Sequence, residues 1–504
     1  MDGPATGDPG EPTDTALSGD PGESTDAGPS GDPREPTDAA PSGDLGPPPS
    51  DGTLRHAVDT LAQPPNGKNL MAPDSGSNSL LRVDNSPASA GDIFGLFYCG
   101  DGSAEDLFYL LLSADSGATW SYLAAMNDEP SPDPQHNIPR ASTLTQDTVT
   151  HAVHHAFWRT NASSMRYDRI ALSHDPDGHV SGWMWLVENQ PGPVFDVAGS
   201  GALYAKLQMQ EVTDGDGASI LVVAGIDRPS ATEEARLVVA RTIAGTKALA
   251  PAATTDWVKV SDGTSGYDVL GAYWTNTDSD PAALMNYENQ DVLMGQHTAD
   301  HTWAQLPADR SLHFFFGPYY YNDGGKPGQI NRWRFTAAGA NWALDTQATG
   351  VVVAAGDAYN RPMMGSTVAT ANYVWFGYGS PQTGLRFDRI DTAGHWTTDA
   401  IPSPDPTSDA DWYLAFSVST DETRAWALWA QPHGPTYERS GYFNGSAWRI
   451  YDDSVTWSAG GAHDPVSWLN VGGWRTGAGV MGYTYDTYGA VTQQYHLHTI
   501  VSPD

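Results

Sequence analysis

The octapeptide at 113–120, Ser-Ala-Asp-Ser-Gly-Ala-Thr-Trp, constrains the fold of this chain more than any other segment. It follows the apolar run 107–112, which predicts a buried strand. The serine and Asp115 carry side chains that accept hydrogen bonds from nearby backbone N–H groups, and Gly117 supplies the positive φ of a tight turn. The threonine re-enters a strand, and Trp120 fills the apolar layer beside it. The segment therefore predicts a β-hairpin.

The pattern Ser-x-Asp-x-Gly-x-Thr-Trp resembles the Asp box, the hairpin signature of sialidase-type and related β-propellers. All five signature positions are present, as Ser113, Asp115, Gly117, Thr119 and Trp120. The resemblance implies a propeller fold over roughly residues 78–504. It also implies that the box lies between the two outer strands of a blade, away from the binding face. It transfers no catalytic residue.

Similar units of strand, glycine turn and aromatic residue recur along the chain. They lead to tryptophans that are spaced by about 40 to 60 residues over most of the chain, the period of a four-stranded blade, namely Trp183, Trp303, Trp342, Trp396 and Trp448. The unit before Trp303 keeps the aspartate and the threonine but has lost the glycine. We expect an all-β fold, a β-propeller of seven or eight four-stranded blades. The last unit lacks an outer strand, and the segment 80–83 is expected to complete it and close the ring. A pair of β-sandwiches is the alternative architecture.

The first fifty residues repeat with a period of twelve, on the pattern Gly-Asp-Pro-Gly-Glu-Pro-Thr-Asp. Such a composition buries too little apolar surface to offset the entropy of ordering, so residues 1–77 are expected to form a disordered acidic arm ahead of a propeller domain at 78–504. Met1-Asp2-Gly3-Pro4 has neither a basic nor an apolar signal-peptide region. Stalks of exported domains have this composition, which favours an extracellular or cell-envelope location. A linker or an incorrectly assigned start explains the arm equally well.

The amino-acid composition limits the kinds of partner that the chain can bind. The chain has 61 acidic and 25 basic residues, a formal charge of −36, which excludes non-specific binding to nucleic acid. Cys99 is the single cysteine, so neither an internal disulfide nor a thiolate metal site can form. No segment is apolar for long enough to span a bilayer. We expect a monomer with no cofactor, no metal and no membrane insertion.

Three segments suggest metal binding and are better explained without it. On a strand, His154 would point away from the face shared by His151 and His155, so the three do not converge. The run Asp-Gly-Asp-Gly at 214–217 is typical of a hairpin turn. The acidic segment 276–280 lacks both the glycine and the final glutamate of a calcium loop.

Candidate binding residues lie in loops that we expect at the rim opposite the box turns, where propellers usually carry function. They are arginines, aromatics and a carboxylate, namely Arg159, Tyr320, Asp323, Tyr359, Arg361, Trp474 and Arg475. Guanidinium groups grip carboxylates and flat rings stack on the apolar faces of sugars, so this set suits a glycan. Each of these residues is equally explained as an ordinary polar loop residue.

Three functions remain open. The first is an extracytoplasmic propeller that binds a glycan or a protein surface through its loop rim. The second, if the chain is an enzyme, is a glycoside hydrolase of sialidase-like type, which would need paired carboxylates. Sialidases also carry an early Arg-Ile-Pro motif, whereas this chain reads Asn-Ile-Pro-Arg at 137–140, which is not a match. The third is a non-enzymatic structural or interaction scaffold.

Overall fold

The computed structural model describes the following residues: 55–61, 65, 70–71, 80–83, 92–99, 107–125, 141–158, 164–194, 207–227, 236–260, 300–317, 330–345, 350–353, 363–380, 384–401, 413–419, 421–430, 436–443, 448–450, 455–457, 470–472, 480–486 and 495–501. All of them belong to one compact unit that begins at Ala40 and ends at Asp504. Residues 1–54, which include most of the expected arm, lie outside the described residues.

The described chain is built from strands that pair antiparallel in seven sheets. Sheet 1 contains β2 (Leu70–Met71), β3 (Leu80–Arg82), β4 (Ile93–Cys99), β5 (Leu107–Ser113) and β6 (Ser121–Ala125). Sheet 2 contains β7 (Ala141–Gln146), β8 (Val153–Trp158), β9 (Ser164–His174) and β10 (Val180–Val194). Sheet 3 contains β11 (Gln208–Thr213), β12 (Ser219–Asp227), β13 (Arg236–Thr242) and β14 (Trp257–Lys259). Sheet 4 contains β15 (Asp300–Leu306), β16 (Ser311–Gly317), β17 (Ile330–Ala338), β18 (Asn341–Leu344) and β19 (Gly350–Val353). Sheet 5 contains β20 (Met363–Ala369), β21 (Tyr373–Ser380), β22 (Gly384–Asp391) and β23 (Trp396–Ile401). Sheet 6 contains β24 (Tyr413–Val418), β25 (Arg424–Ala430), β26 (Thr436–Phe443), β27 (Trp448–Ile450) and β28 (Val455–Trp457). Sheet 7 contains β29 (Asn470–Gly472), β30 (Val480–Asp486), β31 (Tyr495–Val501) and β1 (Arg55–Leu61).

Each sheet is a meander of four strand positions. In sheets 1, 4 and 6 one position is divided between two short strands that pair with the same neighbour. The helical structure in the described residues is one turn of 3-10 helix, η3 (Thr254–Asp256), and none of their helices is long and apolar enough to cross a membrane. The expectation of an all-β chain is therefore confirmed.

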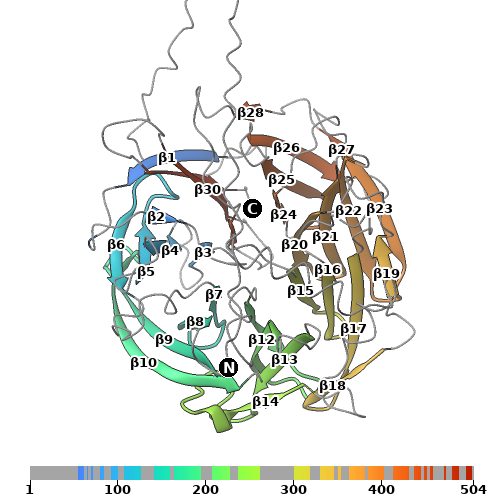
Figure 1. Ribbon diagram of the computed structural model, residues 1–504, viewed down its shortest axis with the longest axis horizontal. Coiled ribbons are helices and arrows are strands. Elements are labelled where there is room, and N and C mark those ends of the chain that lie inside the picture. Colours follow the sequence, from blue (N-terminus) through green and yellow to red (C-terminus); the bar gives the residue numbers. More distant parts are fainter. Residues whose placement is uncertain are drawn as a thin grey trace, which may run out of the picture. The chain divides into compact units, whose positions relative to one another are not determined.

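The seven sheets form a closed ring. Their first strands contact one another in the order β3, β7, β11, β15, β20, β24 and β29, and β29 contacts β3 again. Figure 1 shows the sheets following one another around this ring in chain order. A ring of radially arranged four-stranded meanders is a β-propeller. The prediction of a propeller is confirmed, and the described residues form seven blades.

The ring is closed by β1, which pairs along its whole length with β31, from Arg55 opposite Val501 to Leu61 opposite Tyr495. The expectation that residues 80–83 would close it is wrong, because Leu80–Arg82 pairs with β4 as part of the first position of sheet 1. Leu80 and Leu81 are buried, as a first strand requires. The paired strands therefore begin at Arg55, ahead of the expected domain boundary at residue 78.

The core lies between neighbouring sheets, because each sheet packs both of its faces. Along β12, Leu221 and Val223 face sheet 2, whereas Ile220 and Val222 face sheet 4, and all four are fully buried. Successive residues point to opposite faces of a strand, so a strand between two neighbours needs a continuous apolar run. Burying each of these side chains stabilises the fold by about 1.5–3 kcal/mol.

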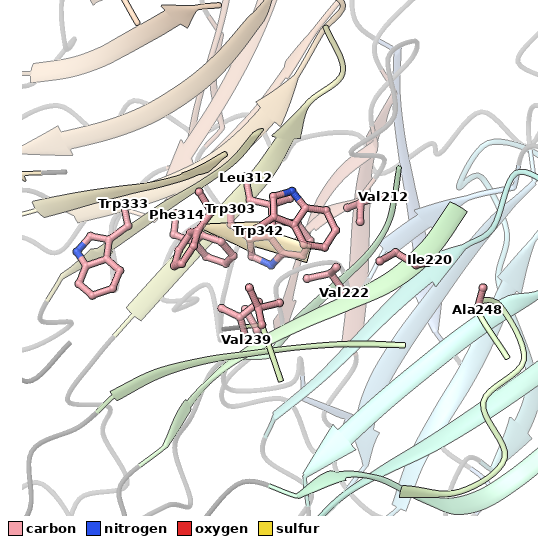
Figure 2. Packing of buried hydrophobic residues seen from close by; sticks show 13 residues of the cluster. Val212, Ile220, Val222, Val239, Ala248, Trp303, Leu312, Phe314, Trp333 and Trp342 are labelled. Atoms are coloured by element: carbon pink, nitrogen blue, oxygen red, sulfur yellow. The ribbon is translucent and has the colours of Figure 1, made fainter. Parts of the chain in front are cut away.

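The cluster between sheets 3 and 4 is the most aromatic of the described core. Trp303, Phe314, Trp333 and Trp342 come together there, and Figure 2 shows them beside the valines of sheet 3. Trp303 and Phe314 stack with ring centroids 5.3 Å apart. This packing holds sheet 4 against sheet 3.

The repeated tryptophans do not all occupy one position. Trp342, in the fourth strand position of sheet 4, is buried, and Trp396 in the fourth strand of sheet 5 contacts Phe315 of sheet 4. Trp303 was grouped with the tryptophans that open a strand after a turn, although its segment lacks the glycine, and this is wrong, because it lies within the first strand β15. The sequence before it has the aspartate and threonine of the box, but here they belong to a strand that lines the ring axis.

Glutamine side chains hold the first strands of sheets 3 and 4 together. Gln208 Oε1 accepts the backbone N–H of Trp303 at 3.0 Å, and its Nε2 donates to the carbonyl of the same residue at 2.8 Å. In the reverse direction, Gln305 accepts the N–H of Thr213 at 2.8 Å and donates to its carbonyl at 2.7 Å. The amide groups thus replace a strand ladder where the two backbones do not pair.

Candidate functional site

The hairpin at 113–121 joins β5 to β6 and has the predicted form. Ser113 Oγ accepts the N–H of Gly117 at 2.8 Å and donates to Asp115 Oδ1 at 2.8 Å. Asp115 accepts the N–H of Thr119 at 2.8 Å and its hydroxyl at 2.7 Å. Gly117 has φ of 92°, and Trp120 is half-buried at the end of the turn. The predicted position between the third and fourth strands of a sheet is confirmed.

The strand order defines two ends of the ring. Because neighbouring strands are antiparallel, the first-to-second and third-to-fourth connections lie at one end, which we call the turn end. The second-to-third connections and the connections between sheets lie at the other, which we call the loop end. The hairpin at 113–121 is at the turn end. The run at 214–217 is also there, and it forms the predicted hairpin turn between β11 and β12.

Side chains at the turn end are bonded to neighbouring sheets. Glu211 of sheet 3 accepts the N–H of Thr148 at 2.7 Å and its hydroxyl at 2.8 Å, from the first turn of sheet 2. Glu422 of sheet 6 accepts the N–H of Asn372 at 2.7 Å and its side-chain amide at 3.0 Å, from the first turn of sheet 5. In both links a carboxylate of one sheet binds a turn of the sheet before it, which couples neighbouring sheets.

Arg310 makes the corresponding link between sheets 3 and 4. Its guanidinium Nη1 donates to the carbonyl of Gly215 at 2.8 Å and to that of Asp214 at 3.2 Å. A Cβ added at Gly215 would clash with the carbonyl oxygen of Gly339, in the outer turn of sheet 4. The Arg310 guanidinium thus binds two carbonyls of this turn and links it to sheet 4.

A buried cluster in sheet 2 contains a carboxylate, an imidazole and a phenol. His154 Nε2 donates to Asp147 Oδ2 at 2.9 Å, and the hydroxyl of Tyr167 donates to His154 Nδ1 at 2.6 Å. Asp147 also accepts the N–H groups of Thr150 and Ala152. The side chains of the aspartate, the histidine and the tyrosine are at most 1% exposed.

The electrostatics of this cluster keep the imidazole and the phenol neutral. Burial opposes ionisation of Asp147, but the hydrogen bonds from His154 and Thr150 outweigh it and hold the carboxyl pKa below its ordinary value. Burial lowers the pKa of His154, so the imidazole is neutral, and burial raises the pKa of Tyr167 far above its ordinary value. The cluster is therefore a buried hydrogen-bond network between a carboxylate, a neutral imidazole and a neutral phenol.

A second, partly buried polar cluster lies within sheet 4. Arg332 donates to His313 Nδ1 at 3.2 Å, His313 Nε2 donates to Ser311 at 2.8 Å, and Ser311 donates to Asp309 at 2.6 Å. The other oxygen of Asp309 accepts from Arg334 at 2.7 Å. The serine proton is therefore given to the carboxylate, the reverse of a nucleophilic Ser–His pair. Burial lowers the pKa of His313 well below its ordinary value and that of Arg332 to about 10.

The three histidines of sheet 2 do not converge. His154 bonds to Asp147 on the face toward sheet 3, whereas His155 Nδ1 donates to Asp168 at 2.8 Å on the face toward sheet 1. His151 lies in the turn before β8, with φ of 55°. The predicted divergence of His154 and His155 is confirmed. Within the described segments, no three His, Cys, Asp or Glu side chains are grouped to hold a metal ion.

The predicted binding residues all lie outside the described residues: Arg159, Tyr320, Asp323, Tyr359, Arg361, Trp474 and Arg475. Their chain positions still assign them to connections. The first five fall between β8 and β9, between β16 and β17, or between sheets 4 and 5, which are loop-end connections. Trp474 and Arg475 fall between β29 and β30, the first and second strands of sheet 7, which is a turn-end connection. Their role in binding stays a prediction.

The chain was compared with known protein families, curated proteins and solved structures. No family model matches the chain, and no curated protein matches it. A polysaccharide lyase, an ulvan lyase, is similar over 88% of this chain and 94% of its own, at 9% identity and a TM-score of 0.46. A lectin from Burkholderia pseudomallei is similar over 84% and 98%, at 11% identity and 0.45. The protein AofleA from Arthrobotrys oligospora is similar over 80% and 92%, at 10% identity and 0.40.

Proposed function

We propose that this β-propeller binds glycans through its loop end. One observation carries the proposal: at the turn end the described polar side chains are bonded to neighbouring turns and sheets. Thr148 with Glu211 and Arg310 with Gly215 are examples. The aspartate of the 113–121 hairpin is bonded within its own turn. This leaves the loop end as the place where polar and aromatic side chains can serve a ligand.

The residue types in the loop-end connections fit a sugar. Arg159 and Arg361 offer planar N–H pairs that match a carboxylate or two neighbouring hydroxyls. Tyr320 and Tyr359 offer a ring for the apolar face of a pyranose and a hydroxyl for its edge. The formal charge of −36 disfavours polyanionic ligands such as nucleic acid, and a neutral or monocarboxylate glycan avoids that repulsion.

Location and assembly belong to the same proposal. The acidic twelve-residue repeats at the start of the sequence suit a spacer that holds the propeller away from a surface. We propose an extracellular or cell-envelope protein that acts as a monomer. A glycan partner is common in that location, and the sequence offers no basic surface for an intracellular polyanion.

The test is a glycan array probed with the full chain, beside a panel of fluorogenic glycosides. The matched variants are Arg361→Ala, at the loop end, and Arg475→Ala, in the turn-end connection of sheet 7. We expect binding to one glycan class, loss of that binding in Arg361→Ala, and no change in Arg475→Ala. Turnover of a glycoside would instead show the hydrolase. The absence of both binding and turnover would contradict both glycan functions and would leave the interaction scaffold.

A further inference from the structure

Two turns of the propeller share the sequence Asp-x-x-Gly-His and the same backbone. They join the third and fourth strands of sheets 2 and 5, at 175–179 and 391–395. In the first, Asp175 accepts the N–H of His179 at 2.9 Å; in the second, Asp391 accepts the N–H of His395 at 2.8 Å. The glycine φ values are 93° and 81°. The two histidines therefore start from equivalent positions.

Their side chains have different partners. His395 is 80% exposed and donates from Nδ1 to Asp391 of its own turn at 3.0 Å. His179 instead donates to Asp92 of the neighbouring sheet 1, at 2.9 Å, and the next N–H, that of Val180, donates to the second oxygen of Asp92 at 2.6 Å. Asp92 is fully buried. A buried carboxylate of sheet 1 is thus bonded at both oxygens by sheet 2.

We propose that His179 and Asp92 form a pH-sensitive latch that holds sheet 1 against sheet 2, stronger in mildly acidic solution than above neutral pH. Because a protonated imidazole adds an ionic attraction to the hydrogen bond, the latch weakens when His179 loses its proton. The Val180 contact remains, so the latch loosens without separating fully.

The latch supports a sheet whose first strand position is short and divided. Its first strand position is divided between β2, with two residues, and β3, with three, whereas the first strands of sheets 2 to 6 have six or seven residues each. Asp92 immediately precedes β4, and its carbonyl accepts the N–H of Val83 just after β3. Loosening Asp92 therefore loosens the segment that keeps β3 in place.

The carboxylates around His179 all favour its protonated form. The hydrogen bond to Asp92 raises the pKa of His179 above its ordinary value of 6.5, and the nearby carboxylates of Asp175 and Asp177 add to this. Burial raises the pKa of Asp92, although His179 and the more distant His174 oppose the rise. A group with a raised pKa in the folded state stabilises it at low pH and loses that contribution as pH rises through the folded pKa. The His179 contribution is therefore complete below pH 6.5 and is lost above it.

The experiment is hydrogen–deuterium exchange of the full chain at pH 6 and pH 8, normalised to the intrinsic exchange rates, with readout in peptides that cover β4 and the start of β10. The variants are His179→Gln, which keeps a donor but cannot titrate, and His395→Gln as the matched control. We expect protection in the wild type and in His395→Gln to fall several-fold between pH 6 and pH 8, because the ionic part of the contact with Asp92 is lost when His179 loses its proton. We expect no such fall in His179→Gln.

Equal falls in all three proteins, or none in the wild type, would overturn the latch. Should His179→Gln fail to fold, the imidazole titration of His179 in the wild type, followed by NMR, decides: a midpoint at or below 6.5 contradicts the proposal. These readouts are independent of glycan binding, so the latch and the proposed function can fail separately.

Discussion

Gln208 and Gln305 each hold the strand on which the other lies. Gln208 binds both backbone polar groups of Trp303, and Gln305 binds both of Thr213, so the first strands of sheets 3 and 4 are joined twice without a strand ladder. Buried backbone groups must find partners, and strands that converge on a ring axis cannot all pair directly. The amide side chain, with one donor and one acceptor, supplies what the missing neighbour would.

Replacing Gln208 with alanine should therefore destabilise the propeller strongly. The change leaves the N–H of Trp303 buried without its acceptor, and leaves the Trp303 carbonyl with only the bond from Gln210. Each buried polar group that is left unsatisfied costs about 1–3 kcal/mol of stability. Gln210→Ala is the matched control, since it removes a single bond to the same carbonyl at 2.9 Å. Urea unfolding should rank Gln208→Ala as the less stable of the two. Equal free energies of unfolding would contradict the role assigned to the clamp.

Asp147 and Asp214 occupy the same position in sheets 2 and 3, directly after the first strand, yet they should respond oppositely to the change to asparagine. Asp147 bonds to His154, whereas in sheet 3 the matching place is taken by Ile220, and Asp214 Oδ2 is buried with no partner in the described structure. Asp147→Asn should cost about 2–4 kcal/mol, because several bonds to the carboxylate are lost. Asp214→Asn should be neutral or stabilising in thermal unfolding. A loss in Asp214→Asn as large as that in Asp147→Asn would show that the lone oxygen has a partner.

Acid should weaken the sheet 2 cluster. The pKa of Asp147 is held below its ordinary value of 3.8 because hydrogen bonds outweigh the effect of burial. A depressed folded pKa contributes stability above the unfolded value, and this is lost as pH falls through the folded pKa. The melting temperature of the wild type should thus fall below pH 4 more steeply than that of Asp147→Asn. Parallel melting curves from pH 6 to pH 2 would exclude this origin.

Gly215→Ala should destabilise the contact between sheets 3 and 4. The new Cβ would clash with the carbonyl oxygen of Gly339, which belongs to a backbone turn and cannot move aside cheaply. Gly215 is not among the glycines with positive φ, so its substitution tests the clash alone, whereas Gly245→Ala tests the strain of a φ of 90° with nothing near its Cβ. We expect differential scanning calorimetry to show a lower melting temperature for Gly215→Ala than for the wild type. An unchanged value would mean that the two turns are further apart.

Local patterns in the sequence were enough for the hairpin at 113–121 and for strands such as β5 and β12. Their signals are short-range: a capping aspartate, a glycine at positive φ, and an apolar run buried on both faces. Closure of the ring was assigned to the wrong strand. Arg55–Leu61 follows a polar, proline-rich stretch, and its partner β31 is at the far end of the chain, so nothing in its spacing points to the pairing.

The contacts that join sheets could not be predicted for the same reason. His179 and Asp92 are 87 residues apart, and Gln208 and Trp303 are 95 apart. His395 shows that the same turn sequence can leave its histidine exposed, so the motif alone does not specify the partner. Trp303 was misplaced because the aspartate, threonine and tryptophan of the box also occur in an ordinary buried strand.

The central claim is a ring of seven sheets closed by β1 against β31, because this closure defines the two ends of the molecule. Two truncations test it most directly: one begins at residue 54 and keeps β1, and the other begins at residue 63 and removes it. Thermal unfolding followed by tryptophan fluorescence should give the first the melting temperature of the full chain and the second a clearly lower one, or no cooperative transition. Identical melting temperatures for both truncations would contradict the closed ring.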